Sequence, residues 1–293
     1  DVNYLVGGVS DGWSKKTENT YDNTDTIYWT LGKLTSSKVT STAPGQGSQY
    51  RESSFVYDPV YTWRLWKEII EPGRSAFTLT TTYGYDTFGN RTSKAVNGAD
   101  LVPQTRTEYY DYLDGRGQFM TGTRNALLQA TLFTYDARTG AVATVTDPNN
   151  IITTYTYNDG FGRKTQEARP GSPTTDIFYY ACSDLAVAGT CPAFAVTAIA
   201  TQSSGAGATW AFHDILGRAV QTNAQGFGGY YTYKNTQYDN LGRVTAVSHP
   251  YFKNTGVPSL DEVPHYTTYT YWPDALGRLR EVIESGPGNR TTS

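Results

Sequence analysis

Polar and aromatic side chains alternate along short runs of the chain, and turn-forming residues separate these runs. In residues 152–157 and again in 267–271, tyrosine alternates with threonine. A period of two places the tyrosines on one face of a β-strand. Threonine and tyrosine suit a pleated strand, and the Gly, Asp and Asn residues that follow suit tight turns. The pattern therefore favours an all-β fold.

The turn that follows these strands has a recurring sequence. Residues 238–243 read Tyr-Asp-Asn-Leu-Gly-Arg. The Asp carboxylate can accept hydrogen bonds from backbone amides two residues later, and the Gly suits the left-handed residue that closes a three-residue hairpin. We therefore expect each copy of this turn to form the tip of an antiparallel hairpin.

Copies of the turn recur along the chain in about nine units, a pattern typical of repeat architectures. The leading aromatic residues are Tyr28, Tyr57, Tyr85, Tyr110, Tyr135, Tyr157, Phe212, Tyr238 and Tyr271. Most successive leads are 22 to 29 residues apart. We predict a single array over residues 1–293, with repeats over about 28–280 and inserts that break the period at about 170–209 and 251–265. Any specific function is expected in these inserts.

The residues of the repeated turn are predicted to be structural. Asp caps the turn, Gly closes it, and a basic residue after the Gly lies near the Asp, where an exposed ion pair contributes about 0 to 1 kcal/mol. The residues assigned to these roles are Tyr85, Asp86, Gly89, Tyr135, Asp136, Gly140, Tyr157, Gly162, Arg163, Gly217, Arg218, Tyr238, Asp239, Gly242, Arg243, Tyr271, Gly277 and Arg278.

The tyrosines of the strands have two interpretations. They can stack on cross-strand neighbours within the sheet, each pair contributing about 0.2 to 1 kcal/mol. Alternatively, exposed aromatic faces flanked by Asp, Asn or Arg can bind sugar rings or the apolar surface of a partner. Solvent exposure of the rings distinguishes the two.

Two cysteines, Cys182 and Cys191, lie in one loop-like passage inside the first insert. A local disulfide is expected in an oxidising compartment, free buried thiols are the alternative, and a metal site is disfavoured because no His or second Cys pair is near.

Composition and charge narrow the classes of partner. The 293 residues are 38 % apolar, 14 % aromatic and 17 % charged, with 24 tyrosines, which is enough apolar material for a folded core. The net charge of −3 comes without a basic stripe, so no nucleic acid is expected. The most apolar stretch, residues 193–200, is far shorter than a membrane span, so no direct membrane insertion is expected.

Because the chain begins at Asp1 without Met, we expect a processed protein or a segment of a longer one.

No catalytic or cofactor site is expected. The three histidines, His213, His249 and His265, lie in a repeat turn and beside prolines, and none belongs to a recognisable nucleophile or metal motif. The repeated Asp residues are explained as turn caps, and catalytic groups are not usually repeated in this way. We therefore expect a protein that is not an enzyme and that needs no cofactor.

The repeated turn resembles a known family. Tyr-Asp-x-x-Gly-Arg units at intervals in the twenties, as in residues 238–243, are similar to the YD or RHS repeats of bacterial rearrangement-hotspot proteins, the C components of insecticidal toxin complexes, wall-associated proteins and teneurins. The resemblance covers roughly residues 28–280. It implies a spiralling sheet of antiparallel β-hairpins, here an arc or partial hollow shell, in a secreted or cell-surface protein.

The resemblance also implies partners. They are the remainder of the same polypeptide or an enclosed toxin domain, with glycans or cell-surface proteins as the alternative for an adhesive member of the family. The exposed edges of a short sheet would also permit self-association, including into filaments. The segment that closes family toxins and the acidic residues that release their cargo have no counterpart in this sequence, so no self-cleavage is inferred.

Overall fold

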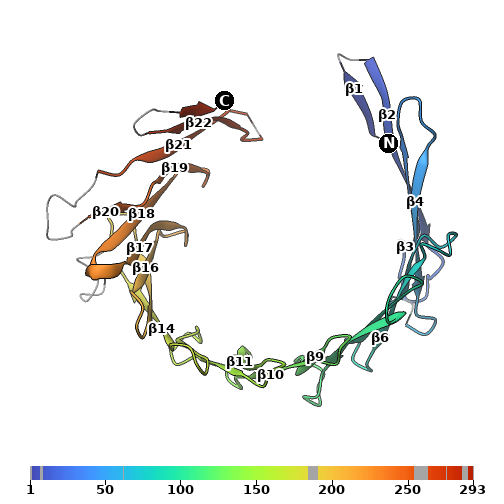
Figure 1. The fold of residues 1–293 in the computed structure, drawn as a ribbon, viewed down its shortest axis with the longest axis horizontal. Helices are drawn as coiled ribbons and strands as arrows, with labels where there is room; N and C mark the ends of the chain where they lie inside the picture. The colour runs from blue at the N-terminus through green and yellow to red at the C-terminus, as the bar shows by residue number, and fades with distance from the viewer. Residues whose placement is uncertain are drawn as a thin grey trace. The chain divides into compact units, whose positions relative to one another are not determined.

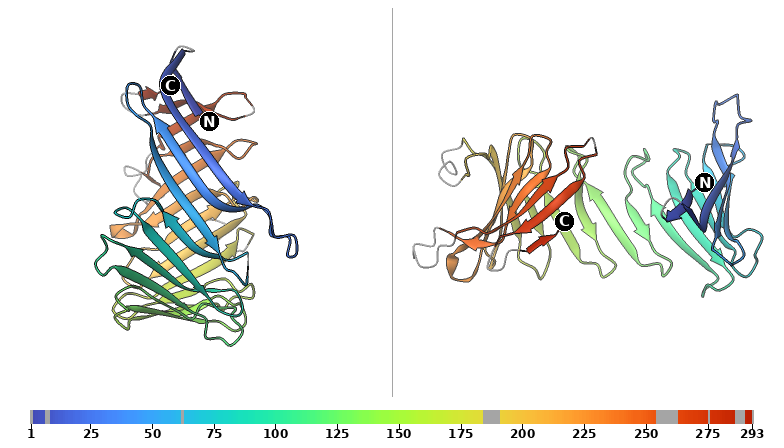
Figure 2. Two further views of the ribbon diagram at one scale, coloured as in Figure 1. Left: turned by 90° about the vertical axis from the view of Figure 1, so that its right-hand side faces the viewer. Right: turned by 90° about the horizontal axis from the view of Figure 1, so that it is seen from above.

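The computed structural model describes residues 2–6, 9–61, 63–183, 191–253, 263–274, 276–285 and 290–292. Nearly all regular structure in these ranges is antiparallel β-strand, and the one helical segment within them is a single 3-10 turn, Phe227–Gly229. Figures 1 and 2 show the strands lying side by side as successive hairpins. The prediction of an all-β sheet of repeated antiparallel hairpins is confirmed.

The strands follow one another with short connections. In the first half they are β1 (Val2–Val6), β2 (Val9–Asp22), β3 (Lys33–Thr42), β4 (Gln49–Tyr57), β5 (Leu65–Ile70), β6 (Leu79–Tyr85), β7 (Arg91–Gly98), β8 (Thr105–Asp111), β9 (Gly122–Arg124), β10 (Ala130–Tyr135) and β11 (Val142–Thr146). In the second half they are β12 (Ile152–Thr156), β13 (Gln166–Ala168), β14 (Thr175–Ala181), β15 (Thr197–Ser203), β16 (Thr209–His213), β17 (Ala219–Gln225), β18 (Tyr231–Tyr238), β19 (Val244–Ser248), β20 (Tyr251–Phe252), β21 (Tyr266–Tyr271), β22 (Leu279–Glu284) and β23 (Arg290–Thr292).

The chain divides into two compact units, and we describe each by itself. The first comprises residues 1–135 and 144–150, and the second comprises 136–143 and 151–293. In the first unit each strand from β1 to β10 pairs with the next. In the second unit the same order runs from β12 to β19.

The sheet of the second unit forks at β18. Thr232 and Tyr233 of this strand pair with β20, whereas Thr236 to Tyr238 pair with β19, which continues to β21. Between the two pairings, the Asn235 amide donates to the Ser248 hydroxyl at 2.8 Å. Most of the predicted insert at 251–265 follows this fork, and its residues 254–262 lie outside the described part of the chain.

A register shift occurs in the same place in many hairpins. It falls at the residue pair that ends in the tyrosine before the turn, as at Val56/Tyr57, Gly84/Tyr85, Gln237/Tyr238 and Thr270/Tyr271. A three-residue hairpin closed by a left-handed glycine places an extra residue on one strand and so produces this kind of bulge. The turn sequence thus also sets the strand register.

The most deeply buried apolar residues lie in the second unit. Among the described residues they are Ala198, Ala200, Phe212, Ala246 and Tyr251. Ala198 and Ala200 of β15 pair in register with Tyr180 and Phe178 of β14 on one side and with Phe212 and Trp210 of β16 on the other. The small alanines allow the rings of the two flanking strands to meet above them.

The structure differs from the sequence expectation in two places. Tyr28 lies exposed in a turn. The first connection closed by an Asp–basic ion pair instead follows Tyr21, where Asp22 and Lys33 lie 3.1 Å apart. Strands therefore begin well before residue 28. The passage 170–209, read as an insert, contributes β14 and β15. These strands do not stand out in the sequence because no Asp-x-x-Gly turn follows Tyr179.

Candidate functional site

The repeated hairpin tip is a compact hydrogen-bonded loop. At residues 239–243, Asp239 Oδ1 accepts from the amides of Leu241 and Arg243, both at 2.9 Å. The Gly242 amide donates to the Asp239 carbonyl at 3.0 Å, and Gly242 has φ = 83°, in the left-handed region. The Asp thus caps the turn and the Gly supplies the backbone conformation that other residues rarely adopt.

The same arrangement recurs in other tips. Asp86 Oδ1 accepts from the amides of Phe88 and Asn90, and Asp214 Oδ1 from those of Leu216 and Arg218. The other assigned glycines all have left-handed φ: Gly89, Gly140, Gly162, Gly217 and Gly277. The tip at Asp136 is one residue longer, since the Gly140 amide donates to the Asp136 carbonyl from four residues away.

An Asp–Arg ion pair closes four of the tips, as the spacing predicts. Nitrogen–oxygen distances are 2.6 Å for Arg218–Asp214 and 2.7 Å for both Arg243–Asp239 and Arg278–Asp274. Arg163 pairs with Asp159 in the same way. Because these arginine side chains are 29 % to 68 % exposed, each pair contributes little stability by itself.

The hydrogen bonds at the tips favour ionised carboxylates. The side-chain hydrogen bond from Arg218 is the largest cause that lowers the pKa of Asp214, and Arg278 acts in the same way on Asp274. Burial alone would raise the pKa of Asp239, but hydrogen bonds from Arg243 and from backbone amides outweigh it and hold that pKa below its usual value. These carboxylates are held as turn caps and not as proton donors.

A second contact, which the sequence pattern does not reveal, joins many of the hairpins to the hairpin before them. The hydroxyl of the leading tyrosine donates to a backbone carbonyl of the preceding unit, as from Tyr238 to Ala219 at 2.9 Å and from Tyr271 to Val244 at 2.8 Å. Equivalent bonds run from Tyr57 to Leu34, Tyr85 to Leu65, Tyr135 to Met120, Tyr157 to Val142 and Tyr179 to Lys164.

The basic residue of the preceding tip lies over the same tyrosine ring. The Cζ of Arg218 is 4.5 Å from the centroid of Tyr238, and that of Arg243 is 4.4 Å from the centroid of Tyr271. Similar pairs are Lys33 with Tyr57, Arg64 with Tyr85 and Arg163 with Tyr179. A cation over an aromatic face is worth about 0.5 to 1 kcal/mol at exposed sites. We call the tyrosine hydroxyl bond and the cation above the ring together the inter-repeat contact.

The inter-repeat contact explains two misread positions. Tyr179 makes the full contact although no Asp follows it, so it leads a unit that the turn sequence does not mark. Phe212 was assigned as a lead but has no hydroxyl, and its ring is almost completely buried beside Trp210. The signal that could have found Tyr179 is a tyrosine in a strand that follows a tip arginine, here 16 residues after Arg163.

The aromatic side chains of the second unit mainly stack on one another. Phe178, Tyr180, Trp210 and Phe212 form a row with centroids 5.6 to 6.4 Å apart and interplanar angles of 10° to 24°. Rings in this geometry stabilise each other. Because neighbouring rings cover their faces, this row favours the packing interpretation over a sugar-binding platform.

Five tips also expose an apolar side chain just before their glycine. Exposed fractions run from 63 % for Phe88 to 85 % for Phe161, and Leu216, Leu241 and Leu276 lie between them. Polar or small residues would satisfy the turn equally well, so the turn geometry does not require these side chains.

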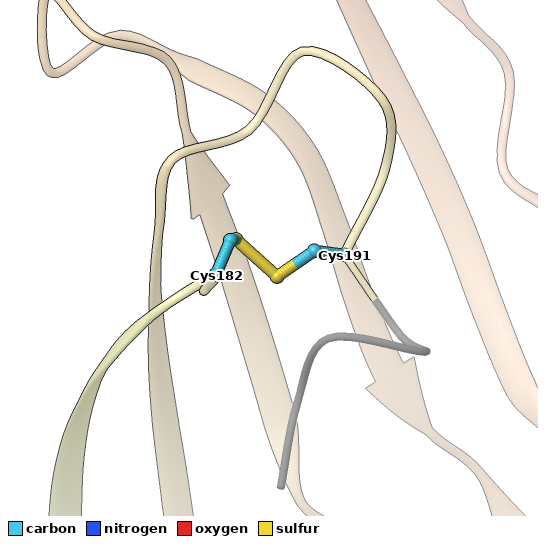
Figure 3. Close-up of a disulfide and its surroundings, with 2 residues drawn as sticks. All are labelled: Cys182 and Cys191. Atoms are coloured by element: carbon cyan, nitrogen blue, oxygen red, sulfur yellow. A yellow bond between two sulfur atoms is a disulfide. The ribbon is translucent and has the colours of Figure 1, made fainter. Parts of the chain in front are cut away.

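Cys182 and Cys191 form a disulfide at the end of β14 (Figure 3). Their Cα atoms are 5.9 Å apart, within the usual range, and the bond closes the loop between β14 and β15. Of the alternatives open for these cysteines, the structure thus has the disulfide, and residues 184–190 of the loop lie outside the described part.

Other chemistry has little support in the described ranges. They contain no group of three or more His, Cys, Asp or Glu residues that could hold a metal ion. His249 contacts the Thr267 hydroxyl at 3.3 Å and gathers no nucleophile. Within the same ranges, no helix has the length and apolar character that crossing a membrane requires.

The chain is similar to known proteins in sequence over one repeat and in structure over most of its length. The family described as RHS Repeat matches residues 135–174. The structure of a TcdB2–TccC3 complex covers 92 % of the chain at TM-score 0.60 and 14 % identity. A Photorhabdus luminescens Tc holotoxin pore covers 97 % at TM-score 0.59 and 14 % identity, and TcdB2–TccC3 without its hypervariable C-terminal region covers 99 % at 0.60 and 15 %.

These likenesses establish the fold but leave most of the related chains unmatched. No curated protein matches the sequence. The chain spans only 15 % to 19 % of the length of the three solved chains. The chain thus contains a segment that matches the RHS repeat, at residues 135–174, and it shares the β-hairpin fold of the Tc toxin structures.

Proposed function

We propose that the chain is a non-catalytic wall segment of a secreted or surface-exposed bacterial RHS-type protein, where it forms part of a shell that encloses or displays a toxin or effector domain. The observation that carries the proposal is the repeated inter-repeat contact. Tyrosine, aspartate and arginine, the residues best suited to chemistry, make hydrogen bonds and ion pairs within the sheet in tip after tip. Side chains that are engaged in this way support a structural role for the sheet and not a catalytic one.

The exposed apolar tip residues support a role within a larger assembly. Soluble proteins rarely expose large contiguous apolar patches, and such patches commonly mark contacts with other protein surfaces. Residues such as Leu241 and Leu276 would be covered if further polypeptide lay against the tips. The remainder of the same polypeptide is the partner that we propose.

A secreted location is supported by the disulfide. Disulfides persist in oxidising compartments and are rare in the cytosol. A local disulfide that closes a loop, as the one between Cys182 and Cys191 does, is consistent with an extracellular protein.

Limited proteolysis of the full-length protein tests the shell. Segments outside the repeats should resist trypsin in the native protein and should be cut rapidly when the same segments are expressed alone. If these segments are cut at the same rate in both settings, they are not enclosed and the shell proposal is wrong.

A second candidate function is binding of glycans or of cell-surface proteins. The stacked aromatic row does not support it, because the rings cover one another.

A further inference from the structure

Two connections of the first unit, between β2 and β3 and between β4 and β5, expose a group of large apolar side chains. They are Ile27, Tyr28 and Trp29 in the first connection and Val60, Tyr61 and Trp63 in the second, with exposed fractions from 41 % to 86 %. Because β3 pairs antiparallel with both β2 and β4, the two connections lie at the same end of the strands. We call these six side chains the aromatic tip patch.

Ring contacts join the two connections into one surface. The centroids of Tyr28 and Trp63 are 6.3 Å apart with an interplanar angle of 69°, and those of Tyr61 and Trp63 are 5.5 Å apart at 67°. Rings in this edge-to-face geometry stabilise each other but do not form a flat platform. The aromatic tip patch is therefore a continuous and irregular apolar surface.

Trp29 is held in a costly backbone conformation. Its φ is 56°, and it is the one aromatic among the four described residues other than glycine that have positive φ. This conformation is unfavourable for any residue with a Cβ, and such residues cluster at functional sites. Because the Trp29 side chain is 74 % exposed, packing within the chain offsets little of that cost. A role outside the chain accounts better for a tryptophan at this position.

The acidic side chains of the two connections bind their own backbone. Asp25 accepts from the Tyr28 amide at 3.1 Å, and Asp58 accepts from the amides of Val60 and Tyr61 at 2.7 and 2.9 Å. Interfaces between proteins carry about one hydrogen bond per 100 to 200 Å². With these carboxylates turned back on the loops, the aromatic tip patch suits a partner that needs apolar contact more than hydrogen bonds.

The charges beside the patch do not select an anion. Lys33 pairs with Asp22 at 3.1 Å, and the Cζ of Arg64 lies 4.2 Å from the centroid of Tyr61 while its Nη1 donates to the Asp86 carbonyl at 3.3 Å. Both cations thus have partners within the chain. The two connections contain three aspartates against these two cations, so they carry no excess of positive charge.

We propose that the aromatic tip patch binds the surface of a zwitterionic lipid bilayer. Tryptophan and tyrosine have an apolar body and a polar end, and they are enriched where a membrane meets water. Trp29 and Ile27 would lie at the level of the headgroups, without any strand crossing the bilayer. This peripheral contact goes beyond the structural role proposed above and does not depend on it, because all of its residues belong to the first unit.

Flotation of the full chain with phosphatidylcholine vesicles tests the proposal. We expect the chain to float with these vesicles at low and at high salt, and brominated phosphatidylcholine to quench its tryptophan fluorescence. Adding phosphatidylglycerol should not strengthen the binding, because the patch has no excess of positive charge. No flotation with phosphatidylcholine, or flotation only with phosphatidylglycerol at low salt, would overturn the proposal.

Three variants locate the contact. Trp29→Gly and Ile27→Ser should each weaken vesicle binding by about tenfold, since each removes a large apolar side chain. Glycine also tolerates the left-handed conformation, so Trp29→Gly should fold as well as the wild type. Phe77→Ser is the matched control, because Phe77 is 70 % exposed but lies in the connection between β5 and β6, at the opposite end of the strands. It should bind as the wild type does.

Two outcomes would contradict the assignment to the patch. One is vesicle binding that is equal in all three variants and the wild type. The other is a dimer of the chain, seen by light scattering, that Ile27→Ser dissociates while no vesicle binding is found. That result would assign the patch to a second copy of the chain and overturn the lipid proposal.

Discussion

The glycine of the repeated turn acts through its backbone. Gly217 has φ = 76°, and a Cβ built on it would meet no atom within 4 Å. A left-handed conformation costs an L-residue about 1 to 2 kcal/mol. Any effect of a side chain here is therefore a backbone effect and not a clash.

Gly217→Ala should lower the free energy of unfolding by about 1 to 2 kcal/mol. Gly160→Ala is the matched control, because Gly160 lies in another tip, outside the left-handed region and with open space around it. It should change stability by less than about 0.5 kcal/mol. Chemical denaturation measures both, and equal losses would contradict the assignment of Gly217 as the left-handed turn residue.

The aspartates of the tips predict how stability depends on pH. Their pKa values are lowered in the fold. Hydrogen bonds from Thr24 and Lys33 lower the pKa of Asp22 to about 2, and the pKa values of Asp214 and Asp239 also lie below their usual value. A carboxyl with a depressed pKa in the fold contributes stability that is present above its unfolded pKa of about 3.9 and is lost as the pH falls through its folded pKa.

The melting temperature should therefore fall as the pH is lowered from about 5 to about 2. The fall should be smaller in a variant in which Asp214 and Asp239 are both replaced by Asn, because two of the responsible groups no longer titrate. A wild-type melting temperature that is flat or rises over this interval would show that the fold does not lower the pKa values of these carboxyls.

At the scale of the hairpin, the inter-repeat contact transmits stability from one unit to the next. Three tip arginines, Arg163, Arg218 and Arg243, have two partners: each pairs with the Asp of its own tip and lies over the tyrosine ring of a following unit. In repeat proteins, stability is approximately a sum of unit terms and nearest-neighbour terms. The inter-repeat contact is part of the nearest-neighbour term.

A double-mutant cycle measures that term. Tyr238→Phe removes the hydroxyl bond to Ala219 and should cost about 0.5 to 1.5 kcal/mol. Tyr238→Leu and Arg218→Gln, alone and together, should show a coupling of about 0.5 to 1 kcal/mol for the cation over the ring. Tyr28→Phe, in an exposed turn, should be neutral. Strictly additive losses would mean that Arg218 acts on its own tip only.

The disulfide is a local element of the second unit. Cys182 and Cys191 are nine residues apart, and in the chain-entropy account a loop of this size gives about 2 to 3 kcal/mol. Replacing both cysteines by Ser should lower the melting temperature, and a reducing agent should have the same effect on the wild type. A melting temperature unchanged by both treatments would show that this loop is dispensable for stability.

The sequence predicts the parts of this structure that are local. The turn at Asp239 is readable because all of its hydrogen bonds lie within five residues. The hydrogen bond from Tyr238 to Ala219 spans 19 residues and depends on strand register. The sequence therefore predicts Tyr238 only as the aromatic residue that precedes a turn.

At the scale of the whole molecule, the chain presents surfaces that its own described residues do not cover. Five tips expose an apolar residue to solvent, and the described sheet is largely half-buried, with few fully buried apolar residues. Such a sheet gains much of its stability from neighbours along the array. Self-association through sheet edges stays a prediction, as does a single array over residues 1–293.

A cryo-EM structure of the full-length protein that contains this chain tests the central claim most directly. We predict that its hairpins continue into neighbouring repeats through the same inter-repeat contact, that Leu241 and Leu276 are covered by further polypeptide, and that the repeats surround another domain. A map in which the repeats stand alone, with these tips in solvent and no enclosed domain, would contradict the account.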